Sequence, residues 1–102
     1  MNPAIKNEIG NLVGAALDAV KPSGEDRVLG LGYAKEIALA LAAAAAAGDP
    51  DERAAALNSA QGFTDALSMM VARYEVDAVI AGRKLVSEML VAGIKLAIAT
   101  LA

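Results

Sequence analysis

The three prolines of this 102-residue chain, at positions 3, 22 and 50, constrain its fold more than any other feature. Proline fits the first turn of a helix but breaks a helix interior, and it disfavours helical geometry in the residue before it. A residue that can cap a helix N-terminus lies beside each proline, namely Asn2, Ser23 and Asp49. Between these junctions the apolar residues recur at helical spacing. The pattern predicts helices over residues 3–20 and 24–47 and a third helical region after residue 49.

The junction at residues 47–53, Ala-Gly-Asp-Pro-Asp-Glu-Arg, carries the most complete set of local signals. Gly48 is expected at the C′ position of the preceding helix, where glycine is the commonest residue. Asp49 is expected to cap the next helix, with Pro50 in its first position. Glu52 follows the cap by three residues, as in a capping box. These residues therefore predict a sharp helix-to-helix turn.

No proline follows position 50, and an unbroken helix over residues 50–101 would be roughly 78 Å long. The polar residues of this region fall into two stripes offset by roughly 130° around the helix axis. The first stripe comprises Asn58, Gln61, Asp65 and Ser68, and the second comprises Arg73, Asp77, Lys84, Glu88 and Lys95. The buried face therefore changes near Tyr74. Either the chain divides into helices over residues 50–72 and 73–101, or one helix continues and changes neighbours. The absence of turn residues favours a continuous or gently kinked helix.

The fold class that follows is all-α, a single domain over residues 1–102. We expect a helical bundle of three to four helices with a long C-terminal helix, continuous or kinked. The helix over residues 24–47 is apolar all round apart from its first turn and the Lys35–Glu36 pair, which predicts burial on most sides. The Gly30-Leu31-Gly32 segment lies inside this periodicity with no strand before it, so it favours close helix packing over phosphate binding. Gly10 and Gly14 are interpreted in the same way, as sites of close helix approach.

Composition excludes several classes of function. The chain has no cysteine and no histidine, which removes disulfides, thiol catalysis, the commonest general base and most transition-metal sites. We therefore expect no enzyme activity, no cofactor and no metal. A net charge of −3 argues against binding nucleic acid or anionic lipid through bulk charge.

Neither apolar stretch predicts a membrane span, because each carries charges near its middle. These charges are Lys35 and Glu36 in residues 28–47, and Glu88 and Lys95 in residues 85–102. The N-terminus lacks the basic and apolar pattern of a signal peptide. The expected location is cytoplasmic if the protein is natural.

The C-terminal helix predicts self-association, because large apolar residues cover about two thirds of its circumference from Val79 onward. The helices before it can cover one side only. Gly82 and Gly93 lie within about 20° of each other on the helical wheel, so both could admit a close neighbour. The predicted homo-oligomer interface comprises Ala78, Gly82, Met89, Gly93 and Leu96. The alternative function is a small binding module that captures a partner helix in an apolar groove.

Two resemblances accompany this interpretation. The capped junction, set between Ala/Leu-rich helices over residues 37–57, resembles computationally designed helical proteins. The segment Arg73-Tyr74-Glu75-Val76-Asp77, followed by an amphipathic stretch to Met89-Leu90, is similar to the C-terminal helix of rod subunits in flagellar and type III secretion assemblies. Both resemblances imply a self-assembling structural protein, either a designed assembly or a subunit of a phage or secretion machine.

Overall fold

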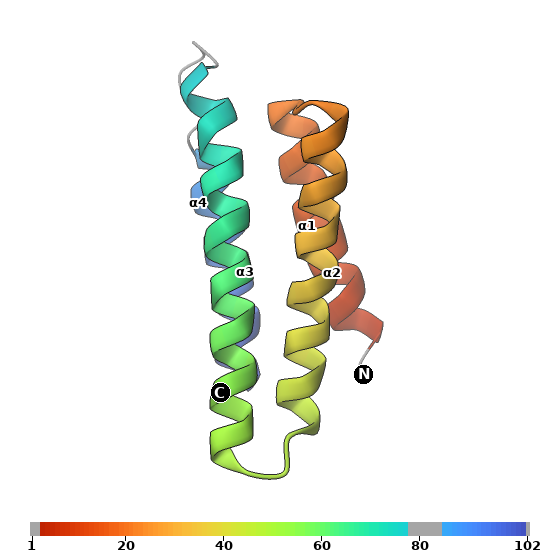
Figure 1. Ribbon diagram of the computed structural model, residues 1–102, viewed down its shortest axis with the longest axis vertical. Helices are drawn as coiled ribbons and strands as arrows, with labels where there is room; N and C mark the ends of the chain where they lie inside the picture. Colours follow the sequence, from red (N-terminus) through yellow and green to blue (C-terminus); the bar gives the residue numbers. More distant parts are fainter. Residues whose placement is uncertain (1–2, 78–84, 102) are drawn as a thin grey trace.

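The computed structural model describes residues 3–77 and 85–101, which form four α-helices (Figure 1). Their bounds are α1 Pro3–Val20, α2 Gly24–Ala46, α3 Pro50–Asp77 and α4 Leu85–Leu101. The described residues contain no strand, which confirms the all-α prediction. The helices run alternately up and down, with α2 and α3 in front and α1 and α4 behind in the view of Figure 1. Packing is most extensive between α2 and α3, and α4 packs against both α3 and α1.

The prediction of one continuous or gently kinked helix over residues 50–101 is wrong. α3 continues past residue 72 to Asp77, α4 begins at Leu85, and α4 packs back against α3. The longest dimension of the molecule is 47 Å, whereas a continuous helix would need roughly 78 Å. Folding back buries Leu90 and Ile94 of α4, which an extended helix would leave in water. The gain from burying these apolar side chains is the physical reason for two helices instead of one.

The turn between α1 and α2 forms where the proline predicted it. α1 ends at Val20, and the backbone N–H of Lys21 donates to the carbonyl oxygen of Leu17 at 2.9 Å. Lys21 has a φ of 50°, the left-handed conformation that commonly closes a helix. The Ser23 hydroxyl accepts a hydrogen bond from the N–H of Asp26 at 3.3 Å, so Ser23 caps α2 as predicted.

The turn between α2 and α3 confirms Asp49 as the cap. Its carboxylate accepts a hydrogen bond from the N–H of Glu52 at 2.9 Å. The Glu52 carboxylate in turn accepts from the N–H of Gly48 at 3.4 Å, one residue earlier than in a standard capping box. α2 ends at Ala46 and not at residue 47, and Ala47 is extended at the C-cap. Gly48 does not adopt the left-handed conformation, because the N–H of Ala47 already closes the helix on Ala44.

The core runs along the axis of the bundle and draws on all four helices. It contains Ile9, Val13, Leu17, Ile37, Leu41, Ala60, Leu67, Val71, Leu90 and Ile94, among others. Thr64 is the buried polar side chain among the described residues, and its hydroxyl donates to the carbonyl oxygen of Ala60 at 2.7 Å. This internal bond satisfies the hydroxyl, so the core stays apolar without an unpaired donor.

Candidate functional site

Large hydrophobic side chains are exposed mainly on α2. Among the described residues, the exposed ones are Val28 (72%), Leu29 (46%), Leu31 (47%), Leu39 (50%), Met69 (69%) and Leu96 (71%). Four of these six belong to α2, which corrects the expectation that this helix is buried on most sides. Single exposed hydrophobic residues are ordinary, but several on one helix mark a candidate contact surface.

The exposed residues of α2 form a stripe along the side of the helix that points away from the core. The buried side comprises Gly30, Ala34, Ile37, Ala38, Leu41 and Ala44. We define the outer seam of α2 as Val28, Gly32, Lys35, Leu39, Ala42 and Ala46, which are exposed except for the half-buried Ala42. Leu29 and Leu31 lie on either side of this seam. Lys35 is the one charged residue in the seam, and Glu36 lies next to it in the chain.

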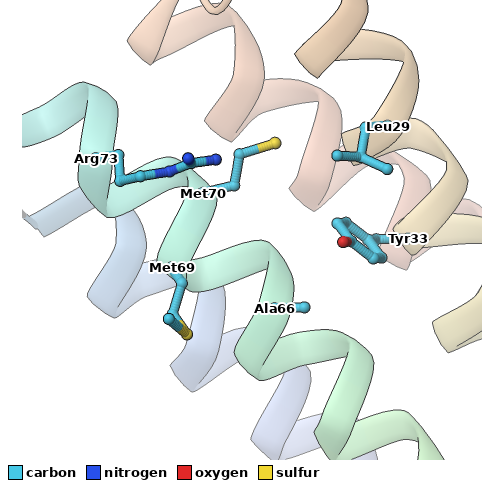
Figure 2. A pocket seen from close by; sticks show the side chains of 6 residues that line it. All are labelled: Leu29, Tyr33, Ala66, Met69, Met70 and Arg73. Carbon is cyan, nitrogen blue, oxygen red and sulfur yellow. The ribbon is translucent and has the colours of Figure 1, made fainter.

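A groove of about 330 Å³ lies between α2 and α3, on one side of the outer seam. Leu29, Tyr33, Ala66, Met69, Met70 and Arg73 line it. Figure 2 shows Leu29 and Tyr33 extending from α2 toward α3, and Met70 extending from α3 toward α2. The Tyr33 ring also packs against Phe63, with ring centroids 6.3 Å apart. The groove is largely apolar, and the exposed Arg73 supplies its cation.

A second groove, of about 260 Å³, lies between α1 and α2 on the other side of the seam. Lys6, Gly10, Leu31, Ala34, Lys35 and Ala38 line it. The two grooves share α2 as a wall, so the exposed apolar surface extends from α1 across α2 to α3.

The helix glycines divide into two groups according to their surroundings. A Cβ on Gly30 would lie 3.0 Å from side-chain carbons of Leu17 and Met70, which confirms close packing at this position. A Cβ on Gly10, Gly14, Gly32 or Gly62 would meet nothing within 4 Å. The prediction of close helix packing at Gly10, Gly14 and Gly32 is therefore wrong within the chain, because an added Cβ at each of them would have open space around it.

The predicted interface on the C-terminal helix is only partly described by the structure. Ala78 and Gly82 lie outside the described residues, and so does the side chain of Met89. Leu96 is exposed, as an interface residue should be. Gly93 faces α1 of the same chain, where a Cβ would lie 2.6 Å from Cδ2 of Leu12. Leu12 therefore already occupies the space that the prediction assigned to a second copy.

One polar cluster joins the start of α2 to α3. The Tyr74 hydroxyl hydrogen-bonds the Asp26 carboxylate and accepts from the backbone N–H of Ser23 at 3.2 Å. Beside it, Arg27 forms an ion pair with Asp18 at 2.9 Å. The polar groups of this cluster are hydrogen-bonded or ion-paired with one another. The residue pattern around Tyr74 did not predict this contact. We interpret the cluster as an anchor that fixes the N-terminal end of α2.

Among the described residues, α2 is also the helix that is long and apolar enough to cross a membrane by length and composition. Its most apolar window has a mean hydropathy of 1.5, and 33% of that window is buried in the bundle. Within the same residues, no group of three acidic side chains is placed to hold a metal ion.

A scan against protein-family models finds no match to the chain, and searches of curated proteins and of solved structures find none.

Proposed function

We propose that the protein is a self-associating structural protein, and that a second copy covers the outer seam of α2. The proposal keeps the homo-oligomer expected from the sequence but moves the main contact surface from α4 to α2. Both resemblances noted above, to designed assemblies and to secretion-rod subunits, agree with a self-assembling role.

The exposed apolar surface of α2 is the observation that carries this proposal. Val28, Leu31 and Leu39 lie on one helix and are about half or more exposed. Fully burying such a side chain contributes about 1.5–3 kcal/mol, so covering several of them is a substantial driving force. On α4, by contrast, Leu90 and Ile94 are already buried and Leu12 covers Gly93, which leaves Leu96 as the exposed large hydrophobic residue among those described.

Light scattering coupled to size exclusion tests the proposal over a wide range of protein concentration. We expect the unmodified protein to have a uniform mass greater than that of one chain. Leu39→Glu should shift this mass toward the monomer, because a carboxylate in an apolar contact is costly. Leu96→Glu is the matched control on α4, and it should leave the mass unchanged.

Circular dichroism of both variants checks that the helices remain folded. If Leu96→Glu dissociates the assembly and Leu39→Glu does not, the interface lies on α4 as the sequence first suggested. A monomeric unmodified protein would contradict self-association on either surface.

The groove between α2 and α3 favours a second candidate function, the capture of a partner helix. Met69 and Met70 line it, and methionine side chains adapt their shape to different apolar partners. This geometry suits helix-in-groove recognition, in which an amphipathic helix places its apolar face into the groove. Such a module should be monomeric when alone, so the same scattering experiment separates the two functions.

A further inference from the structure

The outer seam of α2 has the residue spacing of a two-stranded coiled coil. Its six members follow one another at intervals of 4, 3, 4, 3 and 4 residues. This alternation is the heptad spacing that keeps one stripe of a helix facing a partner helix. The inference below rests on the self-association proposed above and specifies how the two copies meet.

Lys35 decides the orientation of the two helices. In a parallel pair in register, Lys35 would face Lys35 of the second copy in the middle of an apolar seam. Two like charges brought together there are strongly unfavourable. In an antiparallel pair, the Lys35 ammonium lies opposite Leu39 of the second copy and within reach of Glu36, one helical turn away. Each cation then has a carboxylate partner.

We propose that α2 pairs with α2 of a second copy in an antiparallel orientation, about a two-fold axis close to Lys35 and Glu36. The midpoint of the seam, halfway between Val28 and Ala46, falls beside these two residues. A two-fold axis makes the interface self-complementary, so both Lys35–Glu36 contacts form at once. A closed dimer results, because this symmetry uses the same surface on both copies.

The sizes of the facing residues fit this arrangement. Val28 lies opposite Ala46, and Gly32 lies opposite Ala42, so each of these layers contains at least one small residue. A Cβ on Gly32 would meet nothing within 4 Å in the single chain. Glycine in a helix interior is less stable than alanine by about 1 kcal/mol, and close approach of a second helix would offset that loss.

Charge reversal tests the Lys35–Glu36 contact. Lys35→Glu places four carboxylates around the axis and should weaken dimerisation at least about tenfold. Adding Glu36→Lys in the same chain exchanges the two charges and should restore dimerisation toward that of the unmodified protein. Lys95→Glu on α4 is the matched control and should leave the dissociation constant unchanged. Because the exchange reverses every charge in the cluster, failure of the double variant to rescue would contradict the Lys35–Glu36 contact itself.

Cysteine cross-linking tests the orientation directly, since the chain contains no cysteine of its own. Val28→Cys alone should form no disulfide-linked dimer, because the two substituted sites lie at opposite ends of the seam. A mixture of Val28→Cys protein with Ala46→Cys protein should form a linked heterodimer under mild oxidation. Thermal melting of each reduced variant confirms that both remain folded.

The outcomes separate this inference from the proposed function. If the protein is a dimer but Val28→Cys links to itself, the helices are parallel and only the antiparallel inference falls. If the protein is an oligomer and neither combination links, α2 is not the interface and the proposed surface falls as well. A monomer that sediments with phosphatidylcholine vesicles would overturn both, because a lipid surface would then cover the seam.

Discussion

α2 and α4 are both strongly apolar helices, yet the bundle uses them in opposite ways. α4 directs Leu90 and Ile94 into the core and packs Gly93 against Leu12 of α1. α2 buries one side but leaves Val28 and Leu39, among others, on the surface. An apolar circumference therefore predicts that a helix makes contacts, but it does not show whether those contacts lie inside the chain.

The difference follows from how many neighbours each helix has for its apolar surface. α4 packs against α1 and α3, so Leu90 and Ile94 are buried within the same chain, whereas Leu96 stays exposed. α2 packs on α3 and α1 and buries Ile37 and Leu41, among other residues, on its inner side. Its outer seam is not covered by the described residues, and we propose that a second copy covers it.

Truncating a buried side chain of α4 should affect stability far more than truncating an exposed side chain of α2. Ile94→Ala on α4 removes a fully buried side chain and should lower the free energy of unfolding by about 2–5 kcal/mol. Leu39→Ala on α2 removes a half-exposed side chain and should change the stability of dilute protein by much less. Urea denaturation of both variants at low concentration measures the contrast. Equal losses would mean that Leu39 is already covered in the single chain.

The second test concerns the junction that holds α2 against α3. Asp49→Ala removes the hydrogen bond to the N–H of Glu52 and a negative charge from the start of α3. The expected loss is about 1 kcal/mol in the free energy of unfolding. Thermal melting measures it, with Asp51→Ala as a control that removes a charge from the same turn but leaves the cap in place. If both variants lost the same free energy of unfolding, the effect would come from the helix dipole alone and not from the cap.

Much of the fold could be predicted from the sequence because its helix ends depend on local chemistry. Ser23 and Asp49 cap their helices as expected, and Pro22 marks the end of α1. The division between α3 and α4 could not be predicted in the same way. The change of polar stripe placed the division near Tyr74, whereas α3 ends at Asp77 and α4 begins at Leu85. The physical reason for two helices is the burial of Leu90 and Ile94 in the core.

The candidate site was harder to predict than the fold, for a related physical reason. Periodicity shows which residues share a helix face, but it does not show which face a neighbouring helix will cover. Gly93 and Leu96 lie about 60° apart on α4, yet one meets Leu12 and the other is exposed. Because α2 is apolar nearly all round, its residue pattern likewise did not show which of its sides faces water.

Substitution of single glycines on α2 and α3 should have the smallest effect. Gly32 in the outer seam and Gly62 on α3 both have open space where a Cβ would lie. Alanine at either position should raise the stability of dilute protein by up to about 1 kcal/mol, because glycine is the poorer helix former. Gly32→Ala should in addition weaken dimerisation by keeping the paired helices apart, whereas Gly62→Ala should leave dimerisation unchanged. Melting at low concentration measures the change in stability, and light scattering at high concentration measures the change in dimerisation. If both variants dimerised equally well, Gly32 would not lie in the interface.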